Sequence, residues 1–304
     1  MITINRVLCP IDFAASSAEV LASAAAIARY HGAKLTVLHV AGGYPVPAGP
    51  TPGRRQPARA FWLQRLREIT ADLREAQEGV AVAVREGEPV RRILEEASIG
   101  RADLIVMGTQ GRSGLNRLLL GSVAEAVLRR ASCPVLTVPP ASLERALPVR
   151  GGLFSRILCP VDFSEASLAA LDYGLTLAQE AQGHLTLLYV FEETHAASAD
   201  HSWLARAGFH NDLMRLVPDD AHDWCAVRTL VGVGEAGDEI LRVALDEEVD
   251  LIAIGAPRSS GRGWGLDSTS GRVIREAPCP VITLRAPVAA RVPAAVRAEV
   301  ATVG

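Results

Sequence analysis

The chain has 304 residues, of which 49% are hydrophobic and 5% aromatic, and its formal net charge is −3. This length favours two domains, each large enough to bury a core. The charge balance excludes the strongly basic composition of many nucleic-acid-binding proteins, and the longest apolar runs are far shorter than the roughly 20 residues of a membrane-spanning helix. We therefore expect neither a nucleic-acid partner nor a membrane segment.

Short β-branched runs alternate with helical patterns along the first half of the chain. The runs that predict strands are 6–11, 34–40, 80–85, 103–107 and 134–138. Apolar residues at helical spacing lie between them: Val20, Leu21, Ala24, Ile27 and Ala28; then Trp62, Leu66, Ile69 and Leu73; then Val90, Ile93, Leu94 and Ala97. Because the strands are apolar throughout, both faces of their sheet are expected to be covered, which is typical of a parallel, doubly wound α/β fold.

Segment 41–60 interrupts this alternation. It contains a Gly-Gly pair, five prolines and an Arg-Arg pair. Such a composition is typical of a mobile connection. Two interpretations stay open, a lid over a site and an ordinary disordered loop, and the composition favours the loop.

The pattern of the first half recurs in the second half. Residues 6–13 and 35–40 are echoed at an offset of 150 residues, 103–108 at 147, and 133–135 at 146. Because the order is kept and the offset drifts so little, we infer one duplicated domain. The predicted division is a first domain (1–140, repeat one), a linker (141–153), a second domain (154–286, repeat two) and a flexible tail (287–304).

The N-terminal residues and the cysteines indicate a compartment. The chain enters its first strand-like run without the regions of a secretory signal. Its five cysteines are an odd number and have no CxxC spacing, which argues against a disulfide framework or a structural zinc site. We expect a cytoplasmic protein in which four cysteines that precede prolines are buried and inert: Cys9, Cys133, Cys159 and Cys279.

Candidate binding residues of repeat one lie where strands end. In an open parallel sheet, ligands bind beyond the carboxyl ends of the strands, at the point where the strand order reverses. The residues expected there are Pro10-Ile11-Asp12 after the first strand, Gly108 and Gly111 after the fourth, and Gly121-Ser122 at the start of the next helix. Glycines let a phosphate approach the backbone, and a helix N-terminus offers unpaired N–H groups with a partial positive charge. Turn glycines with a purely backbone role remain the alternative.

The combination of this glycine spacing, Pro10-x-Asp12 and the helix entry at 118–124 resembles the ATP-binding loop of the universal stress protein family. The resemblance covers both repeats nearly end to end, without the linker and the tail. It implies an α/β protein with two tandem doubly wound, Rossmann-like domains. Each would contain a five-stranded parallel sheet of order 3-2-1-4-5. It also implies ATP, with or without Mg²⁺, as the ligand.

The resemblance further implies a role for individual residues. Adenine would lie near Ile11, Asp12 and Val40, ribose at Asp12 and Gly108, and the phosphates at Gly111, Gly121, Ser122 and Val123. Pro10 and Met107 adjoin these positions and complete the candidate site. Arg112 is a candidate contact of the phosphates that no other feature of the sequence supports. A solvated Arg112 side chain is an equal alternative.

Other side chains have competing interpretations. Asp12 is also placed to cap the following helix, a role that Ser16 or Ser17 can share, and capping is favoured for its counterpart Asp162. Four histidines crowd one region of repeat two, but their separations do not match the i, i+4 spacing of a helical zinc pair: His195, His201, His210 and His222. We expect no metal site.

Repeat two departs from the glycine pattern. Asp267 stands opposite Gly121, and Arg258 stands opposite Gly111. A carboxylate repels phosphate, and Asp267 is suited to cap its own helix. We expect one nucleotide per chain, in repeat one; the alternative that Arg258 lets repeat two bind a different anion stays open.

These features favour a stress-response or regulatory protein that binds ATP and is not an efficient enzyme. The sequence has no P-loop lysine motif and no recognisable base to align water against a γ-phosphate, although weak ATPase activity stays open. The alternatives are a nucleotide-dependent enzyme of unknown reaction, because fold alone does not fix function, and an interaction scaffold without ligand. The fifth strands, at open sheet edges, are expected to pair within the chain as an intramolecular pseudo-dimer; a further homodimer stays open.

Overall fold

The computed structural model describes residues 3–14, 16–42, 58–109, 120–139, 153–191, 208–256 and 268–285. Repeat one contains β1 (Arg6–Pro10), α1 (Ser17–His31), β2 (Lys34–Ala41), α2 (Ala58–Ile69), α3 (Ala71–Ala76), β3 (Val80–Glu86), α4 (Pro89–Gly100), β4 (Leu104–Gly108), α5 (Ser122–Arg130) and β5 (Val135–Val138). The five predicted strands agree with these bounds to within one residue.

Repeat two contains the same succession of strands. Its elements are β6 (Arg156–Pro160), α6 (Glu165–Ala181), β7 (His184–Phe191), the 3-10 helix η3 (Asp219–Asp223), β8 (Ala226–Val233), α8 (Ala236–Asp246), β9 (Leu251–Ala256), α9 (Thr269–Glu276) and β10 (Val281–Arg285). Residues 208–215 are also helical. No helix in the described ranges is long and apolar enough to cross a membrane.

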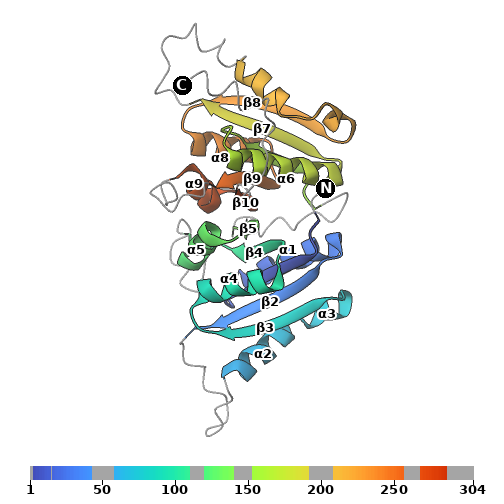
Figure 1. The fold of residues 1–304 in the computed structure, drawn as a ribbon, viewed down its shortest axis with the longest axis vertical. Coiled ribbons are helices and arrows are strands. Elements are labelled where there is room, and N and C mark those ends of the chain that lie inside the picture. Colours follow the sequence, from blue (N-terminus) through green and yellow to red (C-terminus); the bar gives the residue numbers. More distant parts are fainter. Residues whose placement is uncertain are drawn as a thin grey trace.

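All ten strands form one sheet of order β3-β2-β1-β4-β5-β10-β9-β6-β7-β8 (Figure 1). Within each repeat the order is the 3-2-1-4-5 arrangement that the resemblance implies, and neighbouring strands are parallel. Between the repeats, β5 and β10 are antiparallel, with Leu136 opposite Ile282. The Thr137 hydroxyl donates a hydrogen bond of 3.1 Å to the Val281 carbonyl across this pair.

Helices cover both faces of the sheet, and alternate residues of each strand enter different buried layers. In β1, Val7 and Cys9 belong to the layer under α1, α2 and α6, whereas Leu8 belongs to the layer under α4, α5, α8 and α9. Each layer contains residues of both repeats. Two buried faces explain why the strands read as continuous apolar runs.

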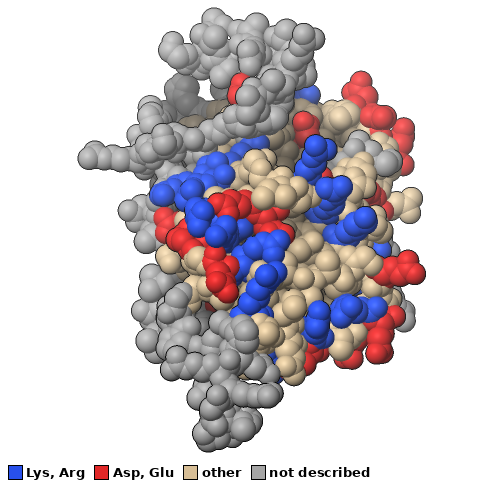
Figure 2. Space-filling view, turned by 60° about the horizontal axis from the view of Figure 1, so that its bottom comes forward, with Lys and Arg blue, Asp and Glu red and all other residues tan. Residues whose placement is uncertain are grey.

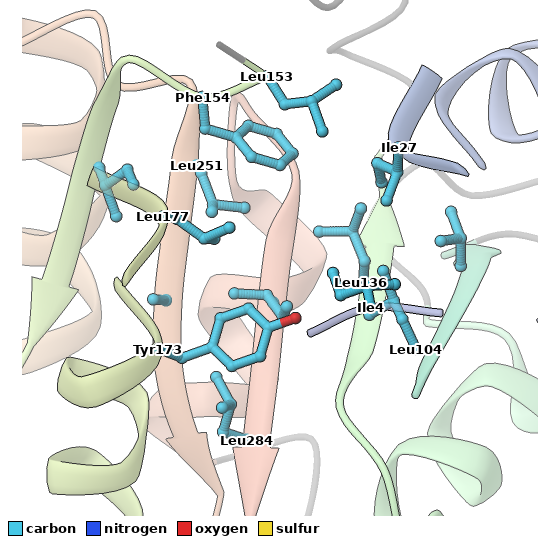
Figure 3. Packing of buried hydrophobic residues seen from close by; sticks show 14 of the residues in the cluster. Ile4, Ile27, Leu104, Leu136, Leu153, Phe154, Tyr173, Leu177, Leu251 and Leu284 are labelled. Carbon is cyan, nitrogen blue, oxygen red and sulfur yellow. The ribbon is translucent and has the colours of Figure 1, made fainter. Parts of the chain in front are cut away.

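Apolar side chains fill the junction between the repeats (Figure 3). Repeat one contributes Ile4, Ile27, Leu104 and Leu136, and repeat two contributes Leu153, Phe154, Tyr173, Leu177, Leu251 and Leu284. Full burial of one large aliphatic side chain stabilises the folded state by about 1.5–3 kcal/mol. The junction also has polar contacts, because the Tyr30 hydroxyl donates to the Glu180 carbonyl at 3.2 Å.

The helix expected over Trp62, Leu66, Ile69 and Leu73 is broken into α2 and α3. The break lies at Thr70, whose side chain is fully buried and whose hydroxyl donates to the Leu66 carbonyl at 2.7 Å. A hydroxyl that bonds to the carbonyl four residues earlier competes with the backbone and often bends a helix. Ile69, the last residue of α2, is 37% exposed, so its expected place on the buried face of this helix is wrong.

Several expectations concern residues outside the described ranges. They include most of segment 41–60, nearly all of the linker, and the tail. Acidic and basic side chains both occur over the face shown in Figure 2, as the near-neutral net charge of −3 suggests.

Candidate functional site

The carboxyl ends of β1 and β4 form the centre of the candidate site. The two strands are parallel neighbours, with Leu8 opposite Ile105, so Pro10 lies level with Met107 at the same edge of the sheet. The chain proceeds from β1 towards β2 and β3 on one side and places β4 and β5 on the other. This reversal of strand order is the place where open α/β sheets bind ligands.

Asp12 lies in the turn that follows β1. One carboxylate oxygen, Oδ1, accepts hydrogen bonds from the Ala14 N–H at 3.0 Å and the Ser17 hydroxyl at 3.3 Å. The N-cap of α1 is Ser16, which makes no side-chain capping hydrogen bond. The structure therefore does not support the capping role of Asp12, and the carboxylate is held by the turn itself.

The start of α5 lies beside the end of β4. Gly121 is the N-cap of α5 and makes no side-chain capping hydrogen bond, while its own N–H donates to the Thr109 carbonyl at 2.8 Å. The N–H groups of the first helical turn have no partner within the helix. Ser122 is exposed and Val123 half-buried, so this turn has the chemistry of an anion-binding site.

An apolar wall lies on the α4 and α5 side of the same edge. Met107 and Leu120 are buried there, and Val40 packs against their cluster. Ile11 is buried in the other layer, under α1 and α2, and its N–H donates to the Leu38 carbonyl at 2.8 Å. Leu120 was not among the expected site residues, although its place directly before Gly121 could have suggested it.

The structure thus brings most of the candidate residues to one edge of the sheet. These are Pro10, Ile11, Asp12, Val40, Met107, Gly108, Gly121, Ser122 and Val123. Gly111 and Arg112 lie outside the described residues.

Comparison with known proteins agrees with this architecture. The universal stress protein family matches residues 3–139 and again residues 153–285. The chain belongs to the universal stress protein family. Its two matched segments and the continuous sheet make it a tandem-domain member.

Individual relatives match either one repeat or nearly the whole chain. A universal stress protein of Methanocaldococcus jannaschii is 34% identical over 138 residues, which cover 44% of this chain and 81% of that protein. One of Mycolicibacterium smegmatis is 27% identical over 295 residues, 92% of this chain and 96% of its own length. The crystal structure of a universal stress protein from Archaeoglobus fulgidus has a TM-score of 0.69 at 23% identity, covering 93% of this chain and 96% of that one, and shares the fold.

In this universal stress protein, repeat two closes the corresponding helix start with its own side chains. Ser268 is the N-cap of α9, and its hydroxyl accepts a hydrogen bond of 3.1 Å from the Gly271 N–H. The Ser270 hydroxyl donates to the Gly255 carbonyl at the end of β9 at 3.0 Å. The expectation that Asp267 caps this helix is therefore wrong, because α9 begins one residue later than the alignment places it. Asp267 and Arg258 themselves lie outside the described residues.

Carboxylates surround the guanidinium of one arginine of α9. Arg272 forms ion pairs with Glu235, Asp238 and Glu276. Hydrogen bonding to Asp238 raises the pKa of Arg272 above its usual value. These three carboxylates outnumber the one cation that they surround and join the start of α8 to α9.

The capping interpretation of Asp162 also needs correction. The N-cap of α6 is Ser164, which accepts a hydrogen bond of 3.2 Å from the Ser167 N–H. Asp162 instead accepts from the Ser164 N–H at 3.0 Å. Burial acts to raise the pKa of Asp162, but the hydrogen bonds from Ser164 and Ser167 outweigh it, and the pKa lies below its usual value.

The cysteines of the universal stress protein are all free thiols. Cys9, Cys159 and Cys279 are buried as expected, whereas Cys133 is half-buried. Burial raises the pKa of Cys9 to about 12 and that of Cys133 to about 11. Both groups therefore stay protonated at neutral pH and are poor nucleophiles.

The histidine-rich region does not form a metal site in the part of the chain that the structure describes. No group of three or more His, Cys, Asp or Glu residues is arranged to hold a metal ion there. The Nδ1 atom of His210 lies 2.7 Å from the Thr229 hydroxyl oxygen. His195 and His201 lie outside the described residues.

Proposed function

We propose that this universal stress protein binds one ATP molecule per chain, in repeat one, and turns it over slowly or not at all. The observation that carries the proposal is the contrast between two helix starts. In repeat one the N-cap of α5 is Gly121, without a capping side chain, whereas the Ser268 hydroxyl caps α9 in repeat two. A stress-response or regulatory role follows from binding without rapid turnover.

The proposed contacts use the groups at the edge of β1 and β4. Adenine packs against Ile11 and Val40, and the ribose hydroxyls donate to the Asp12 carboxylate near Gly108. The first-turn N–H groups of α5 and the Ser122 hydroxyl donate to phosphate oxygens, together with Gly111. Arg112 is a further candidate for binding the phosphates. Mg²⁺, where present, would be bound to the nucleotide.

The proposed asymmetry rests on two features of repeat two. Capping by Ser268 occupies one of the N–H groups that a phosphate would need. The second is Asp267, which stands opposite Gly121 in the sequence and would repel a phosphate, by about 4 kcal/mol for two unit charges 4 Å apart at an effective dielectric constant near 20. One hydrogen bond to a charged group contributes about 1.5–3 kcal/mol, which is less than this repulsion.

Slow hydrolysis is proposed because the sequence has no P-loop lysine motif. We also propose that the functional units are domain one (1–140) and domain two (154–286), joined by the linker and followed by the tail. In cells, we propose a cytoplasmic location.

Isothermal titration calorimetry with ATP tests the proposal. We expect Gly121→Asp to abolish binding, because a carboxylate would replace the open cap of α5. The matched control is Ser268→Asp, which places the same residue at the N-cap of α9 and preserves a good capping side chain. Binding that survives in Gly121→Asp, or is lost equally in Ser268→Asp, would contradict the proposal.

A further inference from the structure

The residue after Asp12 has an unusual backbone conformation. Phe13 has a φ of 60°, in the left-handed region. A residue with a side chain enters this region at a cost of roughly 1–3 kcal/mol. Phe163, its counterpart in repeat two, has a φ of 61°, so the conformation belongs to this turn of the fold and needs support from its surroundings.

Aromatic rings supply that support in repeat one. The ring of Phe13 stacks on Trp62 of α2, with centroids 5.2 Å apart and an interplanar angle of 24°. The ring centroid of His39 in β2 lies 4.8 Å from that of Phe13 and 4.5 Å from that of Trp62. Each such pair contributes about 0.5–1.5 kcal/mol beyond area burial. We call Phe13, His39 and Trp62 the aromatic cluster; its contacts are large enough to offset the backbone cost.

His39 also holds the residue before Asp12. Its Nδ1 atom lies 2.9 Å from the Ile11 carbonyl oxygen, in a buried position. Because a carbonyl only accepts, the Nδ1 of His39 carries the hydrogen and donates. The Ile11 N–H is bound to the Leu38 carbonyl as well. Asp12 is therefore held from both sides, by β2 at Ile11 and by α2 at Phe13.

We propose that Trp62 and His39 are positioning residues for the nucleotide of repeat one and act on it through Asp12. This inference rests on the proposed function. Trp62 lies on a helix outside the expected set of binding residues, so an effect on ATP affinity would have to pass through the turn. A one-ångström displacement of Asp12 would weaken its hydrogen bonds to the ribose, because such bonds depend steeply on distance and angle.

Repeat two shows which replacements this turn accepts. There, Tyr189 stands at the position of His39, and Phe209 packs on Tyr189 at a centroid distance of 4.2 Å. The ring centroid of Phe163 lies 5.6 Å from that of Tyr189 and 6.4 Å from that of Phe209. A phenyl ring in place of indole is therefore compatible with the fold, and Trp62→Phe serves as the conservative variant.

A double-mutant cycle on the full chain tests the inference, with the dissociation constant for ATP as the readout. We expect Trp62→Ala to raise this constant about tenfold and Trp62→Phe to keep it within about twofold of wild type. In an Asp12→Ala background, Trp62→Ala should have no further effect, because the group through which it acts is gone. An equal effect of Trp62→Ala in both backgrounds would overturn the inference.

Two further variants separate positioning from stability. Phe13→Gly removes the ring, and glycine adopts the left-handed conformation without steric strain, so this variant should fold and still raise the dissociation constant. Phe209→Ala removes the equivalent ring of repeat two and should leave ATP affinity unchanged. If wild type binds ATP and both Trp62→Ala and Phe13→Gly bind it equally well, only this inference fails. If wild type binds no ATP, the proposed function fails and the inference fails with it.

Discussion

At the scale of single residues, Asp12 is the carboxylate on which the account depends. Its Oδ1 atom is occupied by the Ala14 N–H and the Ser17 hydroxyl. These bonds orient the carboxylate through Oδ1, and within the described ranges Oδ2 accepts no hydrogen bond. The turn thus presents an oriented acceptor at the edge of the sheet.

We expect Asp12→Ala to weaken ATP binding by roughly tenfold to a hundredfold, because a hydrogen bond to a charged group contributes about 1.5–3 kcal/mol. Asp162→Ala, the same change in repeat two, should leave the dissociation constant unchanged. Calorimetric titration of both variants gives the comparison. Equal losses in the two variants would speak against a site confined to repeat one.

The sequence indicated Asp12, Gly121 and Ser122 because each follows or begins a recognisable element. It did not indicate that Phe13, His39 and Trp62 meet. Their contacts depend on how α2 packs against β2, and no local spacing reports that packing. The exposure of Ile69 was also missed, because the residue buried at the end of α2 is the polar Thr70.

At the scale of elements, the two helices α5 and α9 differ in how they begin. The Gly121-Ser122 entry predicted the helix of repeat one, and the alignment of the repeats predicted its counterpart in repeat two. The glycine pattern favoured the first as the open one. The N-cap residue of α9 was placed wrongly, because the Ser268 hydroxyl accepts from the Gly271 N–H and α9 therefore begins one residue later than α5 does in the aligned repeat. The hydrogen bonds at the helix start decide which residue is the N-cap, and the sequence offset between the repeats does not.

We expect Gly121→Ser to raise the melting temperature and to weaken ATP binding. Relative to glycine, a serine at an N-cap stabilises a helix by only a few tenths of a kcal/mol, so the rise should be small, and its hydroxyl would accept from an N–H group that a phosphate needs. Thermal unfolding without ligand and calorimetry with ATP measure the two effects. Tighter ATP binding in this variant would contradict the role of the open cap.

The reciprocal change is the control for this pair of elements. Ser268→Ala removes the hydroxyl that accepts from the Gly271 N–H and should lower the stability by about 1 kcal/mol. The affinity for ATP should not change.

At the scale of the whole molecule, the junction joins the two repeats through β5, β10 and a shared apolar layer. The internal repeat made the duplication predictable, and the resemblance to the universal stress protein family implied the topology of each half. The register of β5 on β10 was not predictable from the sequence, because an apolar strand edge can pair in several registers.

We expect residues 1–140, expressed alone, to melt below the full chain or to self-associate. Loss of repeat two would expose the edge of β5 and junction residues such as Leu136 and Ile27, and an open edge promotes association. Thermal unfolding and sedimentation measure both properties. A stable monomer that melts like the full chain would show that the junction contributes little.

The junction also predicts a dependence of stability on pH. Burial lowers the pKa of His31 below 6.5, although Glu180 lies 3.9 Å away. The unfolded chain then binds a proton more readily at this residue, so stability should be lost as the pH falls from about 6.5 through the lower folded pKa. Burial raises the pKa of Glu180 and, together with Glu180, that of Tyr30.

Melting temperatures at pH 7.5 and 5.5 test the contribution of His31. In His31→Gln the loss between these two values should be smaller than in wild type, because glutamine does not titrate. An identical loss in both proteins would assign the pH dependence to other groups.

The central claim is that one chain holds one ATP molecule, in repeat one. Native mass spectrometry of the full chain with increasing ATP tests it most directly, because it counts the nucleotides bound to each molecule. We predict saturation at a single ATP adduct in wild type and in Ser268→Asp, and no adduct in Gly121→Asp. Two adducts per chain in wild type, or a single adduct that persists in Gly121→Asp, would contradict the account.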